Sequence, residues 1–301
     1  MNGTSLKLHH PVSAGVAMKY DQSWETEETG SGSFYTTVFQ DGDVYRMYYR
    51  GHDTLLCYAE SQDGINWNRP NLALVDHNGS DQNNIIMTLR ELGSGFGAFL
   101  DTNPNSYKSQ RIKGNMRGDW DYSTNSSNLY GYSTTDSTNW SQIQKEPIAI
   151  GSLPNHWDAQ NVIFWSEAEQ QYVIYARCIV GGDGKIEKNW EKIAKEIMDI
   201  PDEGGVPRFR STARATSPDF INWSEFTPME YSDTDFITPS AQLYTNQTTP
   251  YFRANHIYIS LPGRIFFKKI KKSYASKGGK YKYYTGGYED TSDAVFMTTR
   301  A

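Results

Sequence analysis

Short runs of alternating hydrophobic and polar residues recur along the chain, and such alternation is typical of β-strands with one buried face. The alternation is clearest in VYRMYYRG (44–51) and QYVIYARC (171–178). The runs YKSQRIKGNM (107–116) and HIYISLPGR (256–264) predict further strands. We therefore expect an all-β architecture.

One segment has a different period. Residues 185–200, KIEKNWEKIAKEIMDI, carry apolar side chains at helical spacing, and Pro201 then ends the pattern. We expect a peripheral helix inserted into the β-structure, and a lid over a binding site is the alternative.

A repeat unites the predicted strands. A strand, a polar turn and a tryptophan recur in LLCYAESQDGINW (55–67), LYGYSTTDSTNW (129–140) and STARATSPDFINW (211–223). Aspartate side chains cap main-chain amides in such turns, and the tryptophan offers a large face to bury. A fourth strand of this kind, DAVFMTTRA, begins at Asp293 and stops at Ala301 before its turn.

These repeats predict a β-propeller, in which radial blades of four antiparallel strands surround an axis. The tryptophans of successive repeats are 73 and 83 residues apart. A unit of roughly 75 residues exceeds the ~40–50 of a minimal blade, which implies insertions. We expect one domain over residues 1–301, with five blades of which the last is truncated. A full-length protein longer than this chain is expected, because an open propeller exposes a strand edge.

Composition argues against nucleic acid and membranes as binding partners. The net charge of -6 gives no basic footprint for nucleic acid, and no apolar run is long enough for a membrane helix.

Cys57 and Cys178 lie in strand-like runs and are expected to be free thiols. No metal-binding motif is present, so neither a metal nor a cofactor is expected, and a cation bound in the axial channel is the alternative. The start, MNGTSLKLHHP, lacks an apolar signal core. It fits a cytoplasmic protein, or a periplasmic or secreted one whose signal peptide has been removed. The oligomeric state is left open.

Three carboxylates are candidates for chemistry in the axial funnel, where the innermost strands converge. Glu25 stands beside Trp24, Asp101 follows the apolar run GFGAFL, and Asp158 precedes the run VIFW. Cleavage of a glycosidic bond needs two carboxyl groups, one as general acid and one as nucleophile or base. The candidates therefore predict a carbohydrate partner, although Asp101 alternatively caps a strand end in an Asx-turn.

Polar and aromatic residues near these acids are candidates for substrate binding. They comprise Trp24, Tyr35, His156, Trp157, Gln160, Asn161, Arg177, Asn246, Arg253 and His256. A structural histidine is the alternative for His256.

Several segments together resemble proteins related to glycoside hydrolase family 32, and more loosely the propeller glycosidases of families 43, 68 and 117. They are MYYRG, CYAESQDGINWNRPNLAL, NGSDQNNII, DTNPN, WDAQNVIFW and RATSPDFINW, and the resemblance runs from about Pro11 to Arg300. It implies a five-bladed propeller that cleaves glycosides with carboxylates in its funnel.

The sequence departs from the catalytic motifs of family 32. Trp24-Glu25 stands in place of an Asn-Asp-Pro-Asn motif, and Asp101-Thr102-Asn103-Pro104 approximates the Arg-Asp-Pro motif. WDAQ (157–160) occupies the region of the Glu-Cys motif. The resemblance therefore implies a role most directly for Asp101, and it does not imply a fructoside substrate.

We predict an exo-acting glycoside hydrolase of oligo- or polysaccharides. A glycoside phosphorylase is one alternative, with Arg253, His256 and Arg264 as a phosphate pocket. A non-catalytic carbohydrate-binding propeller is the other.

Overall fold

The structure is a computed structural model of the 301-residue chain. It describes residues 10, 12–25, 35–52, 54–89, 95–121, 127–151, 157, 160–181, 208–230, 243–266 and 291–301. These residues form strands and turns, with a short 3-10 helix η1 at Lys108–Gln110. The expected helix at residues 185–200 lies outside the described residues.

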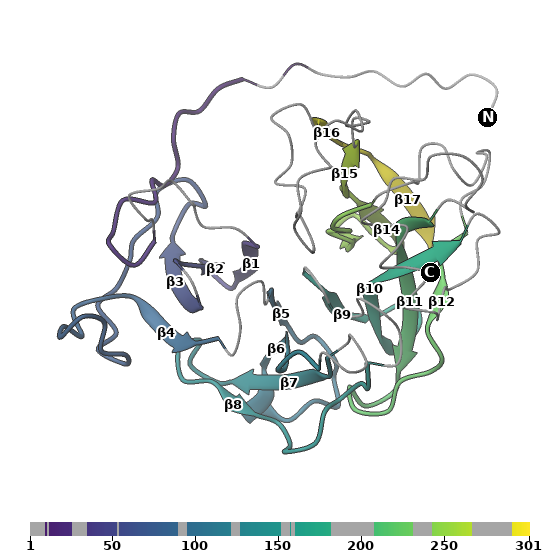
Figure 1. Cartoon of the computed structure of the whole chain (residues 1–301), viewed down its shortest axis with the longest axis horizontal. Coiled ribbons are helices and arrows are strands. Elements are labelled where there is room, and N and C mark those ends of the chain that lie inside the picture. The colour runs from purple at the N-terminus through teal and green to yellow at the C-terminus, as the bar shows by residue number, and fades with distance from the viewer. Residues whose placement is uncertain are drawn as a thin grey trace, which may run out of the picture.

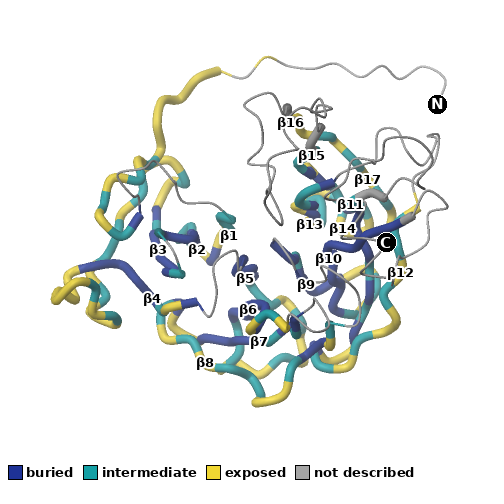
Figure 2. The backbone as a smooth tube through the Cα atoms, viewed as in Figure 1, coloured by how far each residue is buried: buried dark blue, intermediate teal, exposed yellow. Residues whose placement is uncertain are grey.

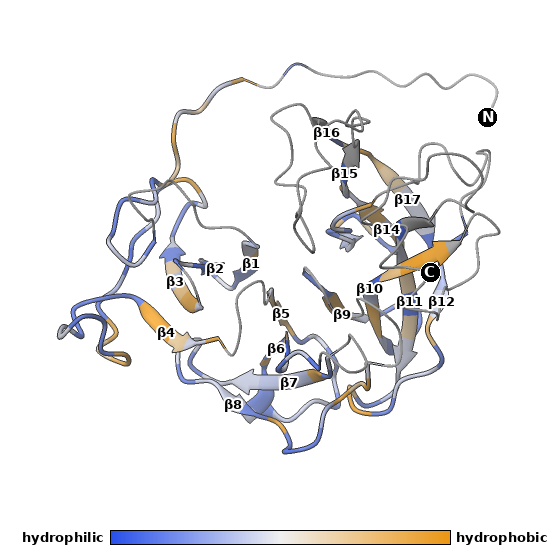
Figure 3. Cartoon of the chain, in the orientation of Figure 1, coloured by the Kyte–Doolittle hydropathy of each residue, from blue (hydrophilic) through white to orange (hydrophobic). Residues whose placement is uncertain are grey.

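The first blade is an antiparallel meander in the order β1-β2-β3-β4. Its strands are β1 (Thr37–Asp41), β2 (Val44–Arg50), β3 (Leu55–Ser61) and β4 (Ile85–Thr88). The turn between β1 and β2 has two residues, and Gly42 there takes a φ of 62° that glycine adopts without steric cost. β4 is among the most apolar segments (Figure 3).

Two further four-stranded meanders repeat this arrangement. The second blade consists of β5 (Phe96–Leu100), β6 (Ile112–Arg117), β7 (Leu129–Thr134) and β8 (Ser141–Gln142). The third consists of β9 (Val162–Ser166), β10 (Gln171–Gly181), β11 (Arg208–Ser217) and β12 (Thr227–Pro228).

The fourth blade is a three-stranded sheet of β13 (Thr249–Tyr251), β14 (Ala254–Ser260) and β17 (Met297–Arg300). The chain between β14 and β17 contributes a hairpin of β15 (Gly263–Phe266) and β16 (Thr291–Ala294). The sheets confirm an all-β propeller with antiparallel blades, of which three have four strands and the fourth has three among the described residues. The described residues form four blades, and the fifth stays a prediction.

The first strand of each meander lies innermost, and the later strands follow toward the periphery (Figure 1). β5 contacts both β1 and β9, which joins three blades near the axis. We call the face where β1, β5, β9 and β13 begin the start face. The opposite face carries the turns between the first and second strands of each blade, and we call it the turn face.

The hydrophobic core is divided among the seams between blades. Tyr48 and Leu56 of the first blade pack with Phe96 and Met116 of the second. A larger cluster around Phe99, Trp165, Tyr172 and Phe220 fills the seam between the second and third blades. Buried residues accordingly follow the strands, while exposed residues gather in the peripheral loops (Figure 2). Such seams hold a propeller together because each sheet buries its faces against its neighbours.

The repeated turns have nearly the same geometry in three blades. The carboxylate of Asp63 accepts hydrogen bonds from the amides of Ile65 and Asn66 and from the side chain of Asn66. Asp136 and Asp219 accept equivalent bonds in their own blades. These hydrogen bonds hold the pKa of Asp63 well below its usual value. The aspartates therefore build turns, as the sequence predicted.

The residue after each aspartate has a left-handed backbone. The φ angles are 73° at Gly64, 80° at Ser137 and 72° at Phe220. Gly64 meets no steric penalty there, whereas the other two residues hold a conformation that costs free energy.

Some predicted strands differ in their bounds. The run at 107–116 begins with η1 and becomes a strand only at Ile112. The run from Asp293 splits between β16 and β17. Cys57 and Cys178 are buried free thiols, as expected. In the described part of the chain, no helix has the length and apolar character needed to cross a membrane.

Candidate functional site

Polar side chains from three blades meet at the start face. Gln160, which precedes β9, donates from Nε2 to the hydroxyl of Thr37 on β1 at 2.9 Å. Gln247, which precedes β13, donates in turn to Oε1 of Gln160 at 2.8 Å. Gln160 is only 4% exposed, whereas Gln247 is exposed. This chain of hydrogen bonds links the first, third and fourth blades.

Two tyrosines extend the same cluster. The hydroxyls of Tyr35 and Tyr244 lie 3.3 Å apart, which brings the first and fourth blades together. Both side chains are half-buried, and Tyr35 has a φ of 58°. Left-handed backbone outside glycine is costly and tends to occur at functional sites. We call Tyr35, Thr37, Gln160, Tyr244 and Gln247 the start-face cluster.

Arg177 supports this cluster from β10. Its Nη2 donates to the main-chain oxygen of Tyr244 at 2.9 Å, and its guanidinium lies 4.5 Å from the centre of the Tyr244 ring. Arg177 is only 5% exposed. The guanidinium thereby fixes Tyr244 through a hydrogen bond and a cation–π contact.

Arginines recur at this position in three blades. Arg50 ends β2, Arg117 ends β6, and Arg177 lies on β10 two residues beyond the last pairing of that strand with β9. All three arginines are buried near the start face. In each of these three blades, the second strand thus carries an arginine toward its start-face end.

A short acidic and aromatic segment also lies at the start face. Gly118 follows β6, and the chain continues through Asp119, Trp120 and Asp121. The guanidinium of Arg117 lies 5.1 Å from the centre of the Trp120 ring. Asp119 and Asp121 are exposed, so carboxylates accompany a half-buried indole at this face.

Glu25 lies near the start-face end of the first blade, on the side that faces away from the second blade. Its carboxylate is fully buried and accepts hydrogen bonds from both Nε and Nη2 of Arg69, at 2.8 and 3.0 Å. The hydroxyl of Tyr49 donates at 2.6 Å, and the amides of Asp21 and Gln22 also donate. With five donors around one carboxylate, Glu25 has the contacts of a structural ion pair.

Asp101 lies at the turn face, after β5. Its buried carboxylate pairs with the ammonium of Lys113, which is itself only 4% exposed. The hydroxyl of Tyr172 on β10 donates to the same oxygen at 2.8 Å, and the amide of Asn103 donates to the other at 3.0 Å. Asp101 thus joins the second and third blades, and it forms the Asx-turn that was the alternative expectation. The described contacts of Glu25 and Asp101 bring neither acid to the other or to the start-face cluster.

Three other predicted binding residues pack inside the fold. The indole of Trp24 donates to Asn84 at 2.7 Å. Trp157 is fully buried against Phe226, so its ring is not an open platform for a sugar. Asn161 bonds the main-chain oxygen of Trp157 and is 1% exposed.

Asn246, which precedes β13, is likewise buried and bonded within the fold. Its side-chain amide donates to the main-chain oxygen of Tyr175 at 3.1 Å, and its Oδ1 accepts from the amide of Thr248. His156 and Asp158 lie outside the described residues.

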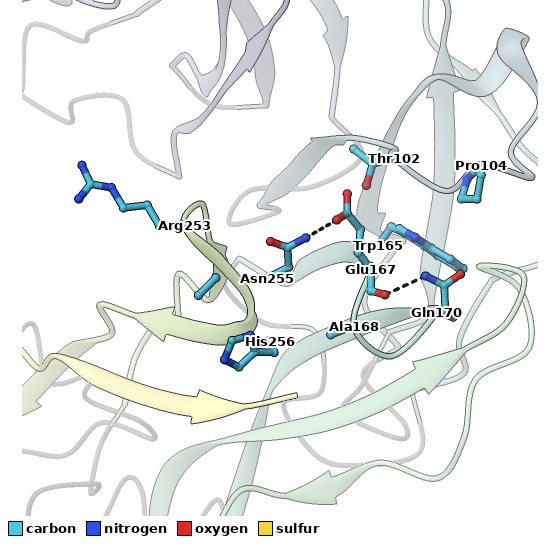
Figure 4. A pocket seen from close by; sticks show the side chains of 10 residues that line it. Thr102, Pro104, Trp165, Glu167, Ala168, Gln170, Arg253, Asn255 and His256 are labelled. Atoms are coloured by element: carbon cyan, nitrogen blue, oxygen red, sulfur yellow. Dashed lines mark hydrogen bonds between the residues drawn. The ribbon is translucent and has the colours of Figure 1, made fainter. Parts of the chain in front are cut away.

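Arg253 and His256 lie far from the start-face cluster, beside a cleft at the turn face. The cleft has a volume of about 750 Å³ and opens between the β9–β10 turn and the β13–β14 turn (Figure 4). Glu167 and Asn255 bridge its centre through a hydrogen bond. Arg264 instead pairs with Asp293 on β16, at 2.6 Å. The predicted phosphate pocket is therefore divided between separate places.

Sequence reasoning missed two residues of the start-face cluster. Thr37 and Gln247 gave no signal of their own, although the polar run TNQTT (245–249) precedes β13 much as Gln160 precedes β9. This polar run directly before a strand was the signal available for Gln247. The described residues contain no group of three or more His, Cys, Asp or Glu side chains placed to hold a metal ion.

No protein family model matches the chain, and no curated protein matches its sequence. Similar solved structures include an N-acetylgalactosamine deacetylase from F. plautii in complex with blood group B trisaccharide. It is 10% identical, with a TM-score of 0.53 over 89% of this chain and 72% of that one.

Two other similar structures are glycosidases. A thermostable family-43 glycoside hydrolase is 12% identical, with a TM-score of 0.48 over 80% of this chain and 67% of that one. A fructofuranosidase from Schwanniomyces occidentalis complexed with fructose is 12% identical, with a TM-score of 0.42 over 75% of this chain and 39% of that one. The match to the deacetylase supports the propeller fold.

Proposed function

We propose that the chain is a glycoside hydrolase that binds its sugar substrate at the start face. The carrying observation is the start-face cluster, in which polar side chains from three blades are linked across the axis. Hydroxyl and carboxamide groups both donate and accept hydrogen bonds, as recognition of sugar hydroxyls requires. Blades surround such a site, so it accepts the end of a sugar chain more easily than its middle. We therefore propose exo-action on an oligo- or polysaccharide.

Hydrolysis needs two carboxyl groups on opposite sides of the scissile bond. We propose Asp158 as one of them, because it stands two residues before Gln160 in the chain. Asp119 and Asp121 are the proposed sources of the second, because they are exposed at the start face beside Trp120. An indole there offers an apolar face on which a sugar ring can stack.

The predicted roles of Glu25 and Asp101 have less support. A nucleophile or general acid must reach the substrate. The carboxylates of Glu25 and Asp101 are instead both fully buried in ion pairs. We assign the chemistry to the start face and treat these two acids as parts of the framework.

The experiment is a screen for sugar release from aryl glycosides and from arabino-, xylo- and galacto-oligosaccharides. The wild type is compared with Asp158→Asn and with Asp43→Asn, which removes an exposed carboxylate from the β1–β2 turn. We expect Asp158→Asn to lose at least ~10³-fold in kcat/KM and Asp43→Asn to retain activity. Equal activity of all three proteins would contradict the assignment of Asp158.

The alternatives are separable in the same screen. Turnover that requires added phosphate would indicate a phosphorylase, although the described positions of Arg253 and Arg264 do not favour one. Saturable binding of sugar without turnover would indicate a carbohydrate-binding propeller. The burial of Glu25 and Asp101 is the observation that favours this second candidate.

A further inference from the structure

We propose that the cleft at the turn face is a second, non-catalytic binding site for neutral oligosaccharides. It is formed by turns of three blades, namely the β5–β6 connection, the β9–β10 turn and the β13–β14 turn. Its volume of about 750 Å³ lies within the range of sites for small ligands. The proposal does not depend on hydrolysis at the start face.

The polar groups of the cleft are arranged for hydroxyl recognition. Glu167 and Asn255 approach each other across it and are hydrogen-bonded, as Figure 4 shows. The side chain of Gln170 donates to the main-chain oxygen of Glu167 at 2.8 Å, which ties the turn together. A carboxylate and a carboxamide, both exposed and held side by side, provide acceptors and donors to a pair of adjacent hydroxyls.

The backbone around the cleft is also constrained. Gln170 has a φ of 55°, and its amide donates to the main-chain oxygen of Ser166 at 2.8 Å. A left-handed glutamine costs free energy, and the hydrogen bonds from Gln170 to the main chain of Ser166 and Glu167 offset that cost and constrain the backbone of the turn. A binding group with a fixed position loses less conformational entropy when a ligand binds.

An exposed aromatic residue stands beside the cleft. Phe252 is 80% exposed, and it immediately precedes Arg253, which lines the cleft. The ring of Phe252 contacts the ring of Tyr251 edge to face, with centres 5.1 Å apart, and the guanidinium of Arg253 lies 5.1 Å from its centre. An exposed phenyl ring on a turn offers an apolar face to the C–H groups of a pyranose or furanose ring.

The charges of the cleft favour a neutral ligand. Glu167 lies at its centre and would repel a phosphate or sulfate group, whereas Arg253 points away from Asn255 and Glu167 in Figure 4. The cleft therefore differs from a phosphate site, in which cations surround the anion. A neutral sugar uses the carboxylate as a hydrogen-bond acceptor at no such cost.

The test is affinity electrophoresis of the full chain in native gels that contain xylan, arabinan, galactan or inulin. All proteins carry Asp158→Asn to limit hydrolysis, and the probes are compared with a gel without polysaccharide. Phe252→Ala and Asn255→Ala remove groups at the cleft, and Phe296→Ala removes a phenyl ring that is 61% exposed elsewhere on the fourth blade. Circular dichroism spectra show whether each variant keeps the β-structure.

We expect at least one polysaccharide to retard the parent protein, and Phe252→Ala and Asn255→Ala to weaken this retardation at least fivefold. Phe296→Ala should bind as the parent does. In the background with Asp158 intact, the two cleft variants should keep any aryl-glycoside turnover that the wild type shows. Retardation that persists in both cleft variants, or its absence from every gel, would overturn the proposal. Neither result depends on whether the start face hydrolyses sugars.

Discussion

Replacing Asp101 with asparagine separates a structural role from a catalytic one. The substitution keeps the shape of the side chain and its acceptor for the amide of Asn103, but it removes the charge opposite Lys113. Both side chains are almost fully buried, so the ammonium would be left in a poorly solvated place. Breaking a buried ion pair in this way costs about 3–5 kcal/mol.

This loss of stability corresponds to a fall in the melting temperature. An unfolding entropy of about 2.1 cal/mol/K per residue over 301 residues converts it to a fall in Tm of roughly 5–8 °C. Differential scanning calorimetry measures the shift, and the glycoside assay is run below the transition. We expect a large loss of stability and an activity within about threefold of the wild type under these conditions.

A second substitution provides the control. Lys113→Met removes the charge of the partner, and the double variant leaves no buried charge uncompensated. We therefore expect the double variant to be more stable than the sum of the single effects predicts, by at least about 1 kcal/mol. If Asp101→Asn kept the wild-type Tm and lost about 10³-fold in kcat/KM, the structural role would be refuted and Asp101 would be catalytic.

Three further predictions concern the framework. Glu25→Gln removes the buried charge of an ion pair whose arginine is partly exposed and also lies 3.5 Å from the carboxylate of Asp21, so chemical denaturation should show a loss of about 1–3 kcal/mol, and an unchanged midpoint would contradict the ion pair. Gly97→Ala places a Cβ against the main-chain oxygen of Asn161 across a blade seam, and should cost about 1–3 kcal/mol, whereas a neutral effect would show that the seam yields. Partial burial acts to raise the pKa of Asp136, but hydrogen bonds from its turn hold the pKa below its usual value. Its contribution should therefore be present above the ordinary aspartate pKa of about 3.9 and be lost as pH falls further. Acid titration of stability should then converge for wild type and Asp136→Ala at low pH, and a constant difference between them would contradict the shift.

The blade repeat could be recognised in the sequence because its causes are local. Asp63 and Asn66 lie three residues apart, so the hydrogen bonds between them involve only residues of the turn itself. The strand at 171–178 was equally visible, since alternation reflects burial on one face. The left-handed Phe220 was not predictable, because only tertiary packing in a seam compensates its backbone cost.

The roles of the acids depend on partners that are distant in sequence. Glu25 meets Arg69, which lies 44 residues away, and Asp101 meets Tyr172, which lies 71 residues away. No local sequence pattern predicts such pairs. An acid before or after an apolar strand therefore signals burial near a blade end, but it does not say which face of the propeller the acid reaches.

Hydrogen–deuterium exchange in the presence of a bound sugar tests the central claim, that the substrate site lies at the start face. Asp158→Asn is exchanged with and without a saturating concentration of the sugar that the wild type releases. We expect slower exchange at residues 35–38, 160–162 and 244–248, where the start-face cluster lies. Protection restricted to the turn face, at residues 101–104, 167–170 and 252–256, would contradict the claim and place substrate binding at the opposite end of the propeller.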